Sequence, residues 1–202
     1  MEPRLSPVRE TNSCVRRNII AVTLAMILVF TVPSITWAQA NPRAEYDLKA
    51  AFLFNFAKFI DWPATSSTKS HSAFTICVLG RDPFGRALDD SLQGKMIRDQ
   101  SLAVRRLNDK TETRGCQVLF VSSSESGHLA DILEIVRGAN VLVVGETPGF
   151  AAAGGVIEFT LEENRVRFTI NTDAANRAGL TVSSKLLALA KVVHDGRPGK
   201  GG

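Results

Sequence analysis

Three short apolar runs in the middle of the chain constrain its fold most. They are FTICVL at 74–79, QVLFV at 117–121 and VLVV at 141–144, and all are rich in β-branched residues. Runs of this length, bounded by polar residues or glycine, are typical of strands that are buried on both faces. Segments with helical features follow the first two runs, at 82–93 and 128–137. This alternation predicts an α/β fold with a mostly parallel sheet and helices on both faces.

The C-terminal part predicts an antiparallel addition to that sheet. The segments 156–161 and 165–170 flank Glu-Glu-Asn, as in a β-hairpin. The glycine- and alanine-rich stretch 148–155 before it is expected to be a flexible connection. A strand is also expected at 102–107, and 172–193 is expected to be helical with a break near Gly179. We therefore expect one α/β domain whose mostly parallel sheet ends in an antiparallel C-terminal hairpin.

A helix rich in phenylalanine is expected before the first strand, from 44 to 62, where Pro63 ends it. On a helical wheel Phe52, Phe56 and Phe59 share one face, which is wide enough to pack on a sheet.

Two aromatic residues of that segment lie outside the face that is expected to pack on the sheet. Phe54 falls on the side of Lys58 and Asp61, and Trp62 lies not far from Lys58 around the helix. We therefore expect Phe54 and Trp62 to contribute to a dimer or partner surface.

The N-terminal segment has the three parts of a secretory signal peptide. Arg16 and Arg17 precede the uncharged run 19–32, and Ala38 and Ala40 supply an A-x-A end. An uncleaved membrane anchor is the alternative, but a spanning helix needs about 20 apolar residues. We expect a signal peptide at 1–40 with cleavage near Ala40, a domain at 41–195 and a flexible tail at 196–202.

The charge balance argues against a nucleic-acid partner. The chain has 24 Lys and Arg and 20 Asp and Glu, of which four and two lie in the first 40 residues. The mature chain would keep 20 and 18, a net charge near +2. Basic residues are scattered, and the doublet Arg105-Arg106 is not the basic face that nucleic acids require.

Two cysteines, Cys77 and Cys116, remain after the expected cleavage. An even number of cysteines in an exported protein favours a disulfide, and two buried free thiols are the alternative. Which of the two forms depends on where the fold places them.

Two loops that follow predicted strands are candidates for a ligand cleft. Arg81 and Asp82 follow the first strand, and Ser122 and Ser123 follow 117–121. Open α/β sheets bind ligands at the carboxyl ends of parallel strands, and free N–H groups at helix starts attract anions. Ordinary turn and capping roles for these residues are the alternative.

No catalytic, metal or cofactor site is expected. The three histidines lie in no H-E-x-x-H or G-x-S-x-G context, and no set of ligands has metal-binding spacing.

Several separated segments, in order and with their spacing, resemble the YfiR family. They are NFAKFIDWP (55–63), ICVLGRDPFG (76–85), CQVLFVS (116–122), GFAAAGGVIEF (149–159), RVRFTIN (165–171) and AGLTVSSKLLALA (178–190). The resemblance covers about 46–193. It implies a small periplasmic α/β regulatory protein without a catalytic residue or cofactor.

The resemblance also implies a membrane partner protein, a dimer and a disulfide. The best-known members bind the periplasmic sensor domain of an inner-membrane diguanylate cyclase and repress it, and members are typically dimeric and disulfide-bonded. Cys77 and Cys116 match the family's first cysteine pair, but 151–159 lacks the second pair of some members. We expect a periplasmic repressor that does not itself span the membrane. A periplasmic small-molecule sensor that feeds a membrane partner is the alternative.

Overall fold

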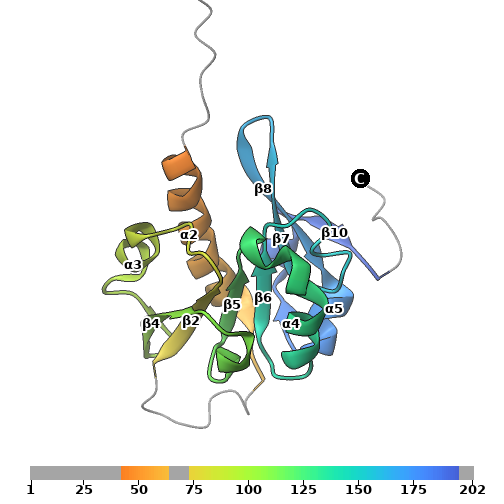
Figure 1. Ribbon diagram of the computed structural model, residues 1–202, viewed down its shortest axis with the longest axis horizontal. Helices are drawn as coiled ribbons and strands as arrows, with labels where there is room; N and C mark the ends of the chain where they lie inside the picture. Colours follow the sequence, from red (N-terminus) through yellow and green to blue (C-terminus); the bar gives the residue numbers. More distant parts are fainter. Residues whose placement is uncertain (1–41, 64–72, 196–202) are drawn as a thin grey trace, which may run out of the picture. The chain divides into compact units, whose positions relative to one another are not determined.

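The computed structural model describes residues 42–63 and 73–195 (Figure 1). The predicted signal peptide at 1–40 and the predicted tail at 196–202 lie outside these residues. The helices are α2 (Pro42–Phe59), α3 (Arg86–Leu92), α4 (Leu129–Ile135), α5 (Thr172–Arg177) and α6 (Ser184–Leu187), with 3-10 turns η2 (Lys110–Thr113) and η3 (Ser123–His128). The strands are β1 (Ile60–Asp61), β2 (Phe74–Leu79), β3 (Met96–Ile97), β4 (Gln100–Leu107), β5 (Val118–Val121), β6 (Leu142–Gly145), β7 (Ile157–Glu162), β8 (Arg165–Asn171), β9 (Thr181–Val182) and β10 (Lys191–Val193).

The fold is α/β and its main sheet is mostly parallel, as the alternation of strands and helices predicted. Its strand order is β10-β8-β7-β6-β5-β2-β4-β3. The strands β4, β2, β5, β6 and β7 run parallel to one another, whereas β3 pairs antiparallel with β4 and β8 pairs antiparallel with β7.

Alternate residues of the central strands pack into two different cores. Ile76 and Val78 of β2 face the larger core, together with buried residues of α2 and α3. Cys77 and Leu79 face the smaller core beside Ile132 of α4. Because both faces of each central strand are covered, the strands read as continuous apolar runs. Figure 1 shows α4 in front of the sheet and α2 behind it.

The chain changes direction across the sheet at β2, which lies inside the sheet between β4 and β5. From β2 it passes through α3 to β4 on one side, and then returns to β5 and β6 on the other. The carboxyl ends of β2 and β5 therefore meet at a topological switch point, where open α/β sheets commonly bind ligands.

Two helix boundaries differ from those expected. The first helix ends at Phe59, because Ile60 and Asp61 pair with β9 in a separate two-stranded sheet. The helix expected from Asp82 begins at Arg86 instead. Asp82 Oδ1 accepts from the backbone N–H of Phe84 and forms a turn before the helix.

The expectation of a helical segment at 172–193 is wrong in part. Only α5 and α6 are helical there, and the segment also supplies β9 and β10. Strand β10 pairs in parallel with β8 and becomes an edge of the main sheet outside the hairpin.

The segment 148–155 is packed, in contrast to the flexible connection expected. Phe150 is fully buried and lies between Gly145 and Gly155. A Cβ atom at Gly155 would lie 2.1 Å from the Phe150 ring, so only glycine allows this close approach.

Candidate functional site

The four residues of the expected ligand cleft lie at the topological switch point. Arg81 and Asp82 follow β2, and Ser122 and Ser123 follow β5. The fold therefore brings together side chains that are about 40 positions apart in the sequence.

One hydrogen bond joins these two loops, and a second lies within the loop that follows β5. The Arg81 backbone N–H donates to Ser124 Oγ at 3.0 Å, and Ser122 Oγ accepts from the Ser124 N–H at 3.4 Å. Ser122 is buried. Gly80 permits the contact, because a Cβ atom there would lie 2.5 Å from Ser124 Oγ. A ligand that accepted from the Arg81 backbone N–H would have to replace its bond to Ser124.

Asp82 is also part of an ion-pair network with Arg106 and Asp89. Arg106 donates from Nε to Asp82 Oδ2 at 2.7 Å and from Nη2 to Asp89 Oδ2 at 2.5 Å. A further bond runs from Arg106 Nη2 to the carbonyl of Gly85 at 2.8 Å. The hydrogen bonds from Arg106 lower the pKa of Asp89. This network fixes the turn before α3 onto β4.

A buried ionic cluster lies at the carboxyl end of β6, which Glu146 follows. Lys49 Nζ is 2.6 Å from Glu45 Oε1 and 2.8 Å from Glu146 Oε2. The side chains of Lys49 and Glu146 are 5% and 8% exposed. Tyr46 donates its hydroxyl to Glu146 Oε2 at 3.1 Å, and its ring lies under Lys49 Nζ at 4.5 Å. Burial, followed by the charge of Glu146, raises the pKa of Tyr46.

Sequence reasoning missed this cluster. The spacing of Glu45 and Lys49 by four residues is a visible helix ion pair, but such pairs are usually solvated. Glu146 joins them only because the fold places the end of β6 beside α2, about 100 residues later in the chain. The cluster anchors the first turns of α2 to the sheet.

Cys77 and Cys116 form a disulfide, with 5.8 Å between their Cα atoms. Cys77 lies in β2, and Cys116 lies two residues before β5, which pairs with β2. Both cysteines are buried in the smaller core. The bond therefore joins β2 to the segment that leads into the neighbouring strand β5.

The two aromatic residues expected at a partner surface have different surroundings. Trp62 is only 7% exposed, packs edge-on against Phe74, and donates from Nε1 to the Ala57 carbonyl. The placement of Trp62 on a partner surface is therefore wrong, because the helix ends before it and the chain turns its ring into the larger core. Phe54 is half-buried, and Lys95 Nζ lies 4.5 Å from its ring centroid.

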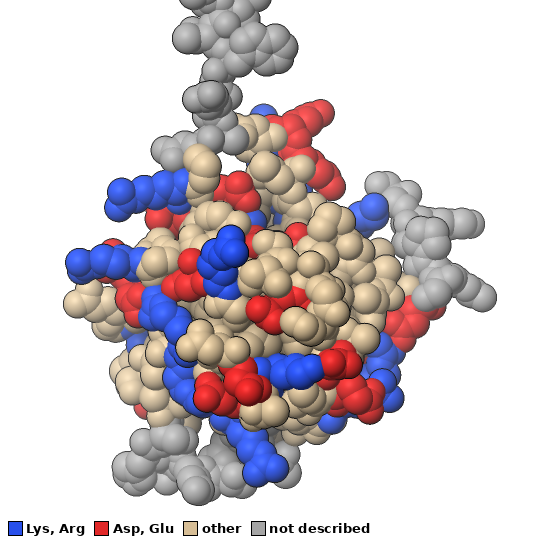
Figure 2. Space-filling view, viewed as in Figure 1, with Lys and Arg blue, Asp and Glu red and all other residues tan. Residues whose placement is uncertain are grey.

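Charged side chains of both signs are interspersed on the face shown in Figure 2. Within 42–63 and 73–195, no helix is long and apolar enough to cross a membrane. Over the same residues, no group of three or more His, Cys, Asp and Glu side chains is arranged to hold a metal ion.

Comparison with known proteins gives a family match over most of the chain. Residues 46–191 match the family model described as YfiR/HmsC-like. This span contains both disulfide cysteines and the two loops at the switch point.

One solved structure shares the fold at low identity. A conserved domain protein from Vibrio cholerae O1 biovar eltor is 10% identical, with a TM-score of 0.51 over 73% of this chain and 59% of that chain. This chain therefore spans less than two thirds of that protein. A second structure, the ABC domain in complex with L-Trp from Streptococcus pneumonia, is 10% identical, with a TM-score of 0.45 over 59% of this chain and 54% of that chain.

Proposed function

Because the chain belongs to the YfiR/HmsC-like family, we propose that it is a periplasmic regulator of a membrane-bound diguanylate cyclase. In this proposal it docks on the periplasmic sensor domain of the cyclase and represses cyclic-di-GMP synthesis in the cytoplasm. The observation that carries the proposal is the family match over 46–191. Its functional form is proposed to be a homodimer, which light scattering of the mature protein would detect at twice the monomer mass.

The disulfide supports an exported protein. Disulfides persist in the periplasm and are rare in the cytosol of most organisms. The bond between Cys77 and Cys116 is buried and joins β2 to the segment that leads into β5. Such a position suits a structural link, and it agrees with the signal peptide proposed for 1–40.

Phe54 is the residue we propose for contact with the partner. Its ring is half-buried against the larger core, and its remaining surface lies beneath the flexible Lys95 side chain. Met96, the next residue, is 59% exposed. A partner could displace the ammonium group and cover both apolar side chains, because exposed cation–π contacts are weak. Aromatic and methionine side chains are common at the centre of protein interfaces.

The test is binding of the mature protein to the purified periplasmic domain of a cyclase from the same genome. We expect co-purification, and we expect deletion of the gene to raise cyclic-di-GMP in cells. Phe54→Ala should weaken association by about tenfold or more, as at interface hot spots. Leu189→Ala is the matched control, because Leu189 is 72% exposed and lies elsewhere on the chain.

Two results would contradict the proposal. One is the absence of binding together with unchanged cyclic-di-GMP after deletion. The other concerns Phe54 alone: if Phe54→Ala lowers the unfolding free energy but leaves association intact, the residue belongs to the core and another surface docks.

A periplasmic small-molecule sensor is the second candidate. The loops that carry Arg81, Asp82, Ser122 and Ser123 support it through their place at the switch point. The bonds that hold the Arg81 backbone N–H and Ser122 Oγ weigh against it, since a ligand that used these two groups would have to replace them.

A further inference from the structure

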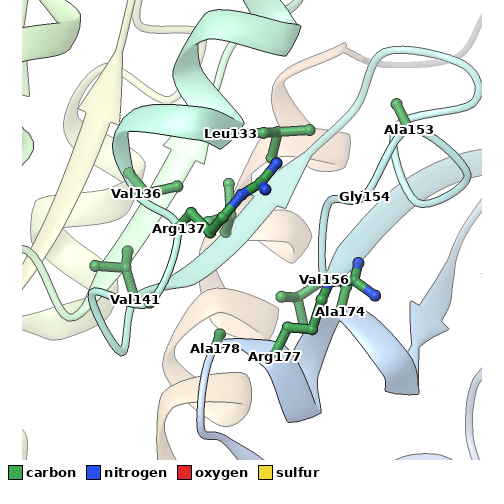
Figure 3. Close-up of a pocket in the computed structure, with 12 residues that line it drawn as sticks. Leu133, Val136, Arg137, Val141, Ala153, Gly154, Val156, Ala174, Arg177 and Ala178 are labelled. Atoms are coloured by element: carbon green, nitrogen blue, oxygen red, sulfur yellow. The ribbon is translucent and has the colours of Figure 1, made fainter.

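A cavity of about 130 Å³ lies between α4, β6 and α5, away from the switch point (Figure 3). Its inner wall is apolar and consists of Leu133, Val136, Val141, Val143, Val156 and Ala174. An engineered apolar cavity of about 150 Å³ is large enough to bind benzene. This cavity therefore has room for one branched aliphatic group or one phenyl ring.

Small residues at the outer side keep the cavity open. Ala153, Gly154 and Ala178 line it and have no side chain long enough to fill it. Ala153 is exposed and Ala178 is half-buried, so this side faces solvent. A Cβ atom at Gly154 would lie 3.8 Å from Leu133 Cδ1, at ordinary contact distance. An apolar cavity that opens to water is a place where a ligand gains by burying an apolar group.

Two arginine side chains border the cavity from different helices. Figure 3 shows Arg137, just after α4, and Arg177, the last residue of α5, on opposite sides of the pocket. Arg137 Nη2 contacts Glu134 at 2.6 Å, and Arg177 contacts Asp195. Glu134 is 65% exposed.

The carboxylate partners of these arginines are replaceable. Solvent-exposed ion pairs contribute little free energy, so an incoming anion competes with them at low cost. A guanidinium group also has five N–H donors in a planar fork that matches a carboxylate. The Asp195 carboxylate, which is 43% exposed, is the competitor closest to Arg177.

We propose that this cavity binds a small monocarboxylate with a branched aliphatic tail. The tail fills the apolar interior, and the carboxylate accepts hydrogen bonds from Arg177, with the charge of Arg137 on the opposite side. The proposal does not depend on the repressor function, because it concerns the mature chain alone.

The competition involves the end of β10. Asp195 Oδ1 accepts from Asn171 Nδ2 at 2.9 Å, and the Asp195 N–H donates to Asp173 Oδ2 at 3.0 Å. A bound carboxylate would remove the Arg177 contact and leave these two. Asp195→Asn removes the competing charge and keeps an oxygen that can accept from Asn171.

The first test measures binding of 3-methylbutanoate to the mature protein by calorimetry and by NMR chemical shifts. A ligand with so few atoms should bind with a Kd of about a millimolar. Acetate lacks the tail and 3-methylbutanamide lacks the charge, so each should bind about tenfold more weakly. Absence of saturable binding, or equal binding of the three compounds, overturns the proposal.

Variants separate the two parts of the site. Arg177→Met should weaken binding of 3-methylbutanoate by about tenfold, and Ala178→Leu should abolish it by filling the cavity. Asp195→Asn should strengthen binding. Arg165→Met is the matched control, because Arg165 is exposed at the start of β8, beside the hairpin turn, and this variant should bind the ligand as the native protein does. Unchanged binding in both Arg177→Met and Ala178→Leu, with native circular dichroism, places the ligand elsewhere and overturns the proposal.

Discussion

Removal of the Lys49 ammonium group should destabilise the protein more than any other single change of a lysine on α2. Lys49→Met keeps the length of the side chain but leaves Glu45 and Glu146 without their cation. Glu146 is 8% exposed and keeps only the Tyr46 hydroxyl as a hydrogen-bond donor among the contacts described. An uncompensated buried charge of this kind costs about 3–5 kcal/mol.

The expected cost follows from the geometry of the cluster. Because Glu45 is 20% exposed, water can solvate it after the change, so we expect the lower end of the range, about 3 kcal/mol. For a domain of this size, this corresponds to a fall in Tm of about 6–12 °C. Urea unfolding followed by circular dichroism would measure it. Lys58→Met is the control, since Lys58 is exposed on the same helix and should change stability by less than about 0.5 kcal/mol.

A second variant tests the cause of the loss. Glu146→Gln in the Lys49→Met background removes the unpaired charge and keeps an oxygen for the Tyr46 hydroxyl. Replacement of a buried ion pair by neutral groups is often nearly neutral, so the double variant should recover more than half of the loss. If Lys49→Met costs no more than Lys58→Met, or if Glu146→Gln recovers nothing, the cluster does not anchor α2 as argued.

Three further outcomes are expected. Cys77→Ser should lower the unfolding free energy by about 4 kcal/mol, because the disulfide closes a long loop, and the native protein should gain two hydrogens in its mass on reduction. Gly155→Ala should cost more than about 2 kcal/mol in urea unfolding through overpacking, whereas Gly127→Ala, where a Cβ atom meets nothing within 4 Å, should be nearly neutral. Arg106 lowers the pKa of Asp89, so this ion pair stabilises the fold above the ordinary aspartate pKa and is lost as pH falls through the lowered value. Arg106→Met should therefore cost up to about 1 kcal/mol at neutral pH, and this cost should shrink as the pH falls through the lowered pKa of Asp89.

The parallel strands could be predicted from sequence because their signal is local. The strand Phe74–Leu79 was predicted to the residue, since all six positions are buried and Gly80 ends the run. The switch-point loops were also predictable, because the carboxyl ends of parallel strands meet at one edge. The hydrogen bond that joins these loops was not predictable, since it depends on the close approach of Gly80 to Ser124.

The C-terminal part could not be predicted in this way. Lys191–Val193 carries no alternation over three residues, and it forms a strand only because β8 offers an unpaired edge. The two-residue strands β1 and β9 likewise exist only as a pair. In such short segments tertiary pairing outweighs local propensity. The cavity beside α5 depends on this same arrangement, so its arginine rim was not visible in the sequence.

The segment 148–155 shows how packing and hydrogen bonds can hold a loop that has no disulfide of its own. The second cysteine pair that some similar sequences carry near this segment is absent here. Instead, the Glu158 carboxylate, on β7, accepts from the backbone N–H groups of Gly149 and Ala151, each at 2.9 Å. The buried Asn171 donates to the Ala151 carbonyl at 2.8 Å.

These contacts form a chain from β7 to the end of β8. A buried carboxylate that accepts two backbone N–H bonds is held by charge-assisted interactions, which are stronger than bonds between neutral groups. Asn171 also caps α5 through the Ala174 N–H and binds Asp195. The loop, α5 and the residue that competes for Arg177 are therefore fixed by one set of bonds. A ligand that displaces Asp195 from Arg177 would remove one bond from this set. By this change, binding of a small carboxylate in the cavity could alter the C-terminal edge of the sheet at β10.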